Sequence, residues 1–285
     1  ENLVLRVLDK ANTLLGLEYL GLDVVNQITI RKLTTKPHGI VLAAGPTGCG
    51  KTTTLYSMLR EINALEKNVL TIEDPIEYHI PLIKQSQVNE QAGLTFSVAI
   101  RHFLRQDPDV MLVGEIRDLE TAKISFQAAM TGHLVLSTIH TNDAASTIAR
   151  LLDLGAEPYL IPTSLRAVIA QRLIRKICPH CVEDYTPAEE ELELYDLKDW
   201  SGAGKSLKRG KGCAACEFTG YSGRTGIFEI LEITPRLSQA ITQKASSDVL
   251  TLEAKQEGMR TMKEDGLSKV LDGITTIEEI FRVTE

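Results

Sequence analysis

The stretch "GPTGCGKTTT", residues 45–54, decides how the rest of the sequence is interpreted. It fits the pattern G-x-x-x-x-G-K-[ST] without a mismatch, at Gly45, Gly50, Lys51 and Thr52. Glycines at these spacings let backbone N–H groups surround phosphate oxygens, and the following helix points its positive end at the same charge. We therefore expect a site for a nucleoside triphosphate and Mg²⁺. The residues expected to form it are Gly45, Pro46, Thr47, Gly48, Cys49, Gly50, Lys51, Thr52 and Thr53.

Apolar runs and amphipathic segments alternate around this loop. The runs predict buried strands over 40–45, 68–74, 109–115 and 133–140. The segments between them predict helices over 51–63, 96–106, 119–132 and 143–155. Apolar strands that alternate with helices indicate a parallel sheet covered on both faces. We expect an α/β fold of the P-loop NTPase (RecA-like) type, with flanking helices and with its reacting groups at the carboxyl ends of the strands.

Composition excludes some classes of protein. The 285 residues carry a formal net charge of −7, and aromatic residues make up 5%. A nucleic-acid footprint is basic and offers stacking rings, so this composition argues against a nucleic-acid partner. No apolar run reaches the ~18–20 residues that a membrane-spanning helix needs, and we expect a soluble globular protein.

Two acidic motifs follow expected strands. "TIEDPIEY" places Glu73, Asp74 and Glu77 at one strand end, and "LVGEIRD" places Glu115 after another. Hydrolysis of a triphosphate requires a group that orients water and a carboxylate near the metal. A carboxylate that ends the strand beside a phosphate loop suits Mg²⁺, so Glu115 is our candidate magnesium ligand together with Thr52. Glu77 fits the alternative of an exposed loop acid.

Three arginines lie near these motifs in the sequence. Arg101 and Arg105 are four residues apart in an expected helix and should share a face. Arg117 follows Glu115 by two positions. An arginine, often from a neighbouring molecule, stabilises charge that develops on the γ-phosphate. The usual alternative for a single arginine is a surface ion pair.

Four of the five cysteines form two C-x-x-C pairs. Cys178 and Cys181 form the first pair, Cys213 and Cys216 form the second, and 31 residues separate the pairs. Four thiolates can close a tetrahedral Zn²⁺ site that is structural and contributes directly to local folding. Redox-active pairs and disulfides remain alternatives. The fifth, Cys49, is interpreted as an incidental small residue with the option of a reactive thiol.

These patterns divide the chain into four parts. Its start predicts two helices, over 2–15 and 22–33, without a core of their own, and we interpret them as the remnant of an N-terminal domain. Its last part predicts helices after a strand or hairpin at 221–233. The expected parts are the N-terminal remnant or linker, the RecA-like core, the tetracysteine zinc subdomain and the C-terminal, mostly helical region: 1–36, 37–175, 176–220 and 221–285.

Several segments together resemble a known family. They are "GPTGCGKTTTLY", "TIEDPIEY", "RQDPDVMLVGEIRD", "TGHLVLSTIHTNDA" and the cysteine pairs, in this order. They resemble the GspE/PulE/PilB family, the hexameric ATPases of type II secretion and type IV pilus assembly, over nearly the whole chain. The resemblance implies a Mg-ATP-hydrolysing homohexamer, cytoplasmic and peripheral to the inner membrane, that powers pseudopilus or pilus assembly. Its implied partners are an inner-membrane platform protein and a recruiting protein.

The resemblance also implies roles for individual residues. Glu73, in a box with Asp74 and Glu77, would polarise the attacking water, and Glu115 would help hold Mg²⁺. His140 would sense the γ-phosphate. His133 flanks the same strand, and a hydrogen bond at a helix end is its equal alternative.

Arginines complete the sites between protomers in this family, and the matching set here is Arg6, Arg101, Arg105 and Arg117. The tetracysteine module occurs in the assembly ATPases and is lacking in the pilus retraction ATPases, which argues against retraction. Two other functions stay open at this point: a zinc-bearing nucleic-acid ATPase, and a nucleotide-dependent scaffold without significant turnover.

Overall fold

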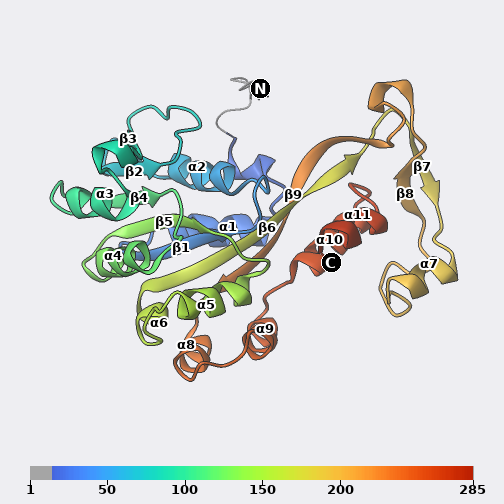
Figure 1. The fold of residues 1–285 in the computed structure, drawn as a ribbon. Coiled ribbons are helices and arrows are strands. Elements are labelled where there is room, and N and C mark those ends of the chain that lie inside the picture. Colours follow the sequence, from blue (N-terminus) through green and yellow to red (C-terminus); the bar gives the residue numbers. More distant parts are fainter. Residues whose placement is uncertain (1–14, 285) are drawn as a thin grey trace.

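A seven-stranded sheet forms the centre of the protein, in the order β3-β2-β4-β5-β1-β6-β9 (Figure 1). The computed structural model describes residues 15–284. Neighbouring strands are parallel except for β9, which pairs antiparallel with β6 at the sheet edge. The strands are β1 Gly39–Ala44, β2 Val69–Glu73, β3 Lys84–Gln87, β4 Val110–Val113, β5 Leu134–Ile139, β6 Leu165–Ile177 and β9 Tyr221–Glu232.

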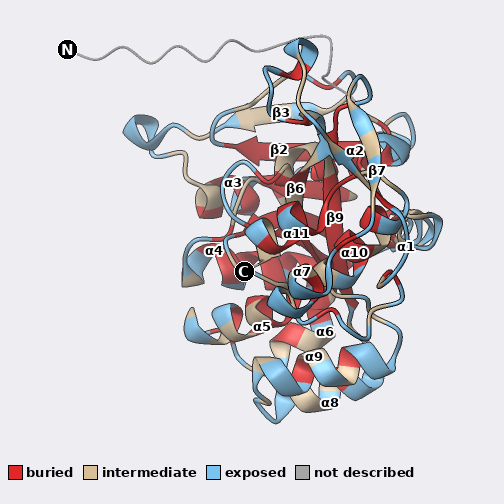
Figure 2. Cartoon of the chain, turned by 90° about the vertical axis from the view of Figure 1, so that its right-hand side faces the viewer, coloured by how far each residue is buried: buried red, intermediate tan, exposed pale blue. Residues whose placement is uncertain are grey.

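Helices cover both faces of this sheet, as continuous apolar strands require. Every residue of β1 is buried. Its Val41 and Ala43 pack with helices on one face, and Ile40, Leu42 and Ala44 pack with helices on the other. The first face carries α1 Val24–Thr34 and α2 Lys51–Glu61, and the second carries α3 Phe96–Phe103, α4 Leu119–Met130 and α5 Ala144–Asp153. The expected α/β fold is confirmed, and Figure 2 shows the buried sheet between exposed outer surfaces.

Helix ends follow from local sequence. Asp143 caps α5 by accepting a hydrogen bond from the Ser146 N–H, and Gly155 follows that helix with a φ of +92°. The expected continuation of α3 to Arg105 is wrong. The helix ends at Phe103, and Arg105 lies in the turn beyond it, where its N–H bonds to the His102 carbonyl oxygen three residues back.

Strand β6 is a feature that the periodicity did not predict. Its first half pairs with β1, from Leu165 to Ala170, and nearly its whole length pairs with β9. Residues 221–232, expected within a separate C-terminal part, therefore complete the central sheet. β6 and β9 continue beyond the other strands toward the cysteine pairs, as Figure 1 shows.

The segment between the cysteine pairs contains a β-hairpin. β7 (Val182–Tyr185) pairs antiparallel with β8 (Leu207–Gly210), and α7 (Glu189–Leu194) lies in the connection. The ring of Tyr195 lies 4.4 Å from that of Phe281, so this hairpin arm packs back on the C-terminal helices.

The remaining helices surround β6 and β9. α8 and α9 lie beside α6 and α5, while α10 and α11 pack on β9 and β6. Their bounds are α6 Leu160–Ser164, α8 Pro235–Thr242, α9 Ser247–Gln256, α10 Met262–Leu271 and α11 Ile277–Thr284. No helix within residues 15–284 has the length and apolar composition needed to cross a membrane.

Glu279 anchors the last helix to β6. Its carboxylate is fully buried and accepts hydrogen bonds from the guanidinium groups of Arg175 and Arg282, at 2.6–2.9 Å, and from the Arg175 N–H at 2.8 Å. Burial alone would raise the pKa of Glu279, but the hydrogen bonds from Arg282 and Arg175 outweigh burial and lower the pKa to about 2. Two arginines thus hold one buried carboxylate where α11 packs on β6.

We predict that Glu279→Gln lowers the free energy of unfolding at pH 7 by about 2 kcal/mol, because both arginines lose a charged acceptor but remain hydrated. The folded-state pKa lies below the ordinary value of 4.5, so this contribution is complete above pH 4.5 and disappears as the pH falls toward 2. Urea unfolding between pH 7 and pH 3 measures both effects.

The matched control is Glu278→Gln, on the exposed side of the same helix, which should leave stability nearly unchanged. Equal stabilities of the two variants at pH 7 would show that the buried carboxylate contributes nothing.

Candidate functional site: a phosphate loop at the carboxyl edge of the sheet

The phosphate loop, residues 45–50, connects β1 to α2. Gly45 has a φ of +147°, and a Cβ there would lie 2.5 Å from the Cys49 Sγ and 2.7 Å from the Gln171 carbonyl oxygen. Only glycine fits this position. The buried Lys51 Nζ donates hydrogen bonds to the carbonyl oxygens of Gly45, at 2.7 Å, and Pro46, at 2.9 Å. The lysine therefore closes the loop upon itself.

Strand β6 supports this loop from the side. The buried side chain of Gln171 donates a hydrogen bond from Nε2 to the Cys49 carbonyl oxygen, at 2.7 Å. The next residue, Arg172, donates to the Asn142 Oδ1 at 3.3 Å. Sequence reasoning missed both residues, although a polar Gln–Arg pair inside the run "LRAVIAQRLI" was the available signal.

Glu115 lies directly after β4, but its strand is not next to the loop strand. β5 lies between β1 and β4, so the expectation of adjacent strands is wrong. The Glu115 carboxylate still lies beside the site, because it contacts His140, which lines a hollow together with Pro46 and Thr47 of the loop. It forms an ion pair with Arg117 and lies 3.6 Å from the His140 Nε2. Glu115, Arg117 and His140 thus place one carboxylate, one guanidinium and one imidazole together after the ends of β4 and β5.

His140 follows β5 and lines a hollow above the phosphate loop. The hollow is lined by Pro46, Thr47, His140, Thr141, Asn142, Asp143 and Ser146. Burial, followed by the nearby Lys51 ammonium, lowers the pKa of His140 below its ordinary value of 6.5. The imidazole is therefore mainly neutral at pH 7 and can donate or accept a hydrogen bond.

Glu73 ends β2 in a buried network. Its Oε1 accepts hydrogen bonds from the Thr71 hydroxyl at 2.6 Å and from the Gln85 side chain at 3.1 Å, and its Oε2 accepts from the Tyr56 hydroxyl. Burial and the Glu73 carboxylate both raise the pKa of Tyr56. Tyr56 lies on α2, the helix that begins at the phosphate loop, so the network joins β2 to that helix. In this conformation both Glu73 oxygens have donors from the chain itself.

The remaining candidates lie at several places. Arg101 forms an exposed ion pair with Glu120 at 2.8 Å, and Arg105 is exposed in the turn after α3. His133 lies at the opposite end of β5 from the loop, where its Nδ1 is 2.9 Å from the Ala128 carbonyl oxygen. That contact favours the helix-end interpretation of His133. Arg6 and most of the helix expected over 2–15 lie outside the described residues.

The four paired cysteines converge at the end of the β6–β9 arm. Their sulfur atoms all lie within 4.8 Å of one another, and the Cys178–Cys213, Cys181–Cys216 and Cys213–Cys216 pairs are 3.8–3.9 Å apart. Zinc–thiolate bonds of about 2.3 Å in a tetrahedron place sulfurs about 3.8 Å apart. The β7–β8 pairing closes the long gap between the two pairs, and the donor set fits a zinc ion.

Backbone N–H groups of Cys213 and Gly220 point at the Cys216 sulfur, at 3.2 and 3.3 Å. The hydrogen bond from Cys213 is the main reason that the pKa of Cys216 falls to about 6. Such N–H donors favour the thiolate form, which is the form that binds a metal.

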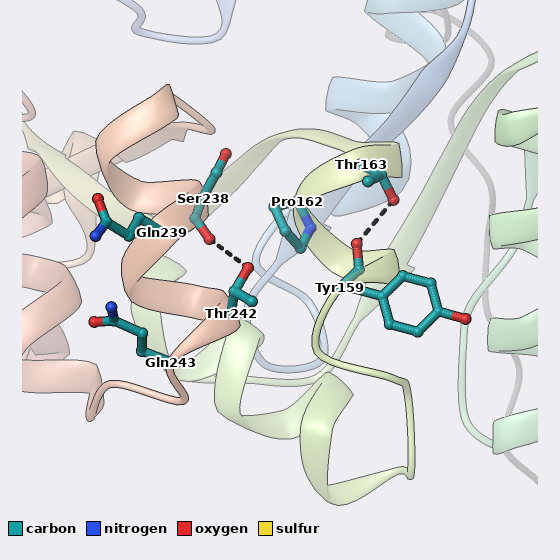
Figure 3. Close-up of a pocket in the computed structure, with 7 residues that line it drawn as sticks. All are labelled: Tyr159, Pro162, Thr163, Ser238, Gln239, Thr242 and Gln243. Atoms are coloured by element: carbon teal, nitrogen blue, oxygen red, sulfur yellow. Dashed lines mark hydrogen bonds between the residues drawn. The ribbon is translucent and has the colours of Figure 1, made fainter.

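A second hollow, between α6 and α8, has no carboxylate, lysine, arginine or histidine in its lining. Tyr159, Pro162, Thr163, Ser238, Gln239, Thr242 and Gln243 line it, as Figure 3 shows. The Thr163 and Thr242 hydroxyls donate to carbonyl oxygens of their own helices. This hollow therefore offers neither a cation for phosphate nor a carboxylate for a metal.

Comparisons with known proteins agree with this geometry. A family model described as "Type II/IV secretion system protein" matches residues 1–282. The Type II secretion system ATPase E of Vibrio cholerae is 48% identical over 285 residues, 100% of this chain and 56% of that protein. The Type IV pilus assembly ATPase PilB of Thermus thermophilus is 47% identical over 284 residues, 100% of this chain and 32% of that protein. The chain thus spans about half, or less, of these relatives.

Solved structures share the fold. The pilus retraction motor PilT with bound ADP superposes with a TM-score of 0.72 at 29% identity, covering 98% of this chain and 68% of that one. The Legionella pneumophila ATPase DotB gives a TM-score of 0.67 at 24% identity, covering 95% and 65%. Since the family model matches nearly the whole sequence and the phosphate loop has the expected geometry, the chain belongs to the type II/IV secretion system protein family.

Proposed function

We propose that this chain is the catalytic part of a Mg-ATP-hydrolysing motor for type II secretion or type IV pilus assembly. The observation that carries the proposal is the convergence of the closed phosphate loop, Glu115 and His140 at one edge of the sheet. The names of the relatives, which are secretion and pilus assembly ATPases, support the same activity.

Lys51 is the residue that we expect to change partners when nucleotide binds. Its ammonium now rests on two neutral carbonyl oxygens. Anionic phosphate oxygens are stronger acceptors for an ammonium, so the lysine would move to the β- and γ-phosphates. The loop N–H groups and the start of α2 would bind the same oxygens.

Thr52 and Glu115 are the residues that would hold Mg²⁺, which supplies charge neutralisation at the phosphates. Arg117, already paired with Glu115, would fix the orientation of that carboxylate. Glu73 would orient water only after leaving part of its network with Tyr56 and Gln85. The neutral His140 would donate a hydrogen bond toward the terminal phosphate.

The cysteine cluster is proposed as a structural zinc site. All four ligand positions come from the protein, so no position remains open for a substrate. Zinc would hold the tip of the β6–β9 arm and the base of the β7–β8 hairpin together. Zinc would add to the stabilisation that this segment gains from Leu192, Leu197 and Leu207, which are buried in the core.

A homohexamer is the proposed active form, with Arg6, Arg101, Arg105 and Arg117 as candidates for completing sites between protomers. Arg101 and Arg105 are exposed on the surface, where a neighbour's site could meet them. The proposed location is the cytoplasmic side of the inner membrane, with platform and recruiting proteins as partners.

We predict that Lys51→Ala abolishes Mg-ATP turnover and that Glu115→Gln keeps ATP binding but lowers kcat by roughly a hundredfold or more, because it removes transition-state charge stabilisation. The exposed Lys123→Ala, on α4, and the exposed Glu66→Gln, after α2, are the matched controls. Steady-state hydrolysis and binding of a fluorescent ATP analogue measure the two steps separately. Turnover by Lys51→Ala at the rate of its control would contradict the proposal.

Turnover per chain should also rise with protein concentration if neighbouring protomers complete the site. Light scattering on the same samples reports the oligomeric state. Magnesium-dependent turnover that stays constant with concentration in a monomeric protein would exclude sites shared between protomers for this chain.

Elemental analysis should find about one zinc per chain. We predict that Cys178→Ser and Cys213→Ser lose the metal and become sensitive to proteolysis within residues 182–212, because the hairpin loses its closure. Cys49→Ser, which changes a cysteine away from the cluster, should retain both the metal and the resistance to proteolysis. Purified protein that lacks metal and contains disulfides under non-reducing mass spectrometry would refute the zinc assignment.

A further inference from the structure

Arg172 lies where β6 passes the phosphate loop. The last pair between β1 and β6 is Ala44 with Ala170, so Gln171 and Arg172 of β6 lie beside the start of the phosphate loop. Gln171 faces α2 and contacts the Cys49 carbonyl, whereas Arg172 faces the start of α5 and reaches Asn142. A guanidinium nitrogen of Arg172 lies 3.5 Å from the position that a Cβ on Gly45 would occupy. Its cation is therefore at the mouth of the loop.

This guanidinium has only neutral acceptors. It donates to the Gln171 carbonyl oxygen at 3.2 Å and to the Asn142 Oδ1 at 3.3 Å, both longer than a typical N–H···O bond of about 2.9–3.0 Å. Within residues 15–284 no carboxylate lies within 4.0 Å of it. Arg175, three positions along the same strand, binds Glu279 with two nitrogens. The strand thus pairs one arginine fully and leaves the other with spare hydrogen-bonding capacity.

A second cation lies near Arg172. The positive charge of Arg172 opposes protonation of Lys51, in addition to the larger effect of burial, and both lower the pKa of that lysine. Two cations around one loop repel each other, and an anion placed between them removes the repulsion. Asn142, which accepts from Arg172, also lines the hollow above the loop together with Thr47 and His140.

We propose that Arg172 binds a non-bridging phosphate oxygen of the nucleotide held in the loop of the same chain. On binding, the guanidinium exchanges its long bonds to neutral oxygens for shorter bonds to an anion. This assignment rests on the proposed nucleotide site and adds a binding residue on β6, on the opposite side of β1 from Glu115 and Arg117. It predicts a loss of nucleotide affinity without a loss of stability.

The test is Mg-ADP binding, measured by titration calorimetry, to Arg172→Gln, Arg172→Met and Arg172→Lys. A charge-assisted hydrogen bond is worth enough that Gln and Met should raise the Kd about tenfold to a hundredfold, and Lys should restore part of the affinity. The melting temperature of nucleotide-free Arg172→Gln should stay equal or rise, because a repulsive charge is removed. A purely structural role would instead lower the melting temperature and would not be rescued by lysine.

Arg166→Gln is the matched control. Arg166 lies at the start of the same strand, away from the phosphate loop, and donates a hydrogen bond to the His38 carbonyl oxygen. Its Kd should equal that of the unchanged chain. Wild-type affinity in Arg172→Gln and Arg172→Met would overturn the inference and leave the proposed function intact. Absence of Mg-ADP binding in the unchanged chain and in Arg166→Gln would overturn both.

Discussion

The pairing of β6 with β1 is the interaction on which the rest of the structure depends. Main-chain pairing from Leu165 to Ala170 aligns the two strands, and this alignment places Gln171 against the phosphate loop. The other edge of β6 pairs with β9, which continues to the cysteine cluster. One strand of 13 residues therefore connects the phosphate loop to the cysteine cluster. If the pairing of β6 with β1 shifted by one residue, Gln171 and Arg172 would each point to the opposite face of the sheet.

The charged and titratable groups at the carboxyl ends of the strands differ in how fully each is already paired. Arg117 is paired with Glu115, the imidazole of His140 is kept mainly neutral, and Lys51 is held on carbonyl oxygens. Only Arg172, among these groups, combines a full positive charge with weak neutral acceptors. Positive charge is therefore available beside the loop, while the Glu115 carboxylate stays paired with Arg117.

The sequence predicted the core well where local signals agree. The glycine loop and the four apolar strands each depend on residues close together in the chain, and all were found. The cysteine spacing also predicted the cluster. What could not be predicted depends on contacts far apart in the sequence. The first half of β6 is buried in the central sheet, and the second half continues with β9 toward the cysteine cluster. β6 therefore mixes apolar and polar residues, and no single hydrophobic period describes it.

The strand order was also beyond the sequence. Periodicity shows that a strand exists but not its neighbour, so the insertion of β5 between β1 and β4 was missed. The helix α3 ended before Arg105, so Arg105 does not share a helical face with Arg101. Arg172 was overlooked because it belongs to no loop motif, and only the fold brings it beside Gly45.

Hydrogen exchange with and without Mg-ADP tests the central claim most directly, namely that nucleotide binds at the edge formed by β1, β4, β5 and β6. The account predicts that slowed exchange is concentrated in residues 45–53, 114–117, 140–146 and 171–172. Slowed exchange centred on the hollow between α6 and α8 instead, with the phosphate loop unchanged, would contradict it.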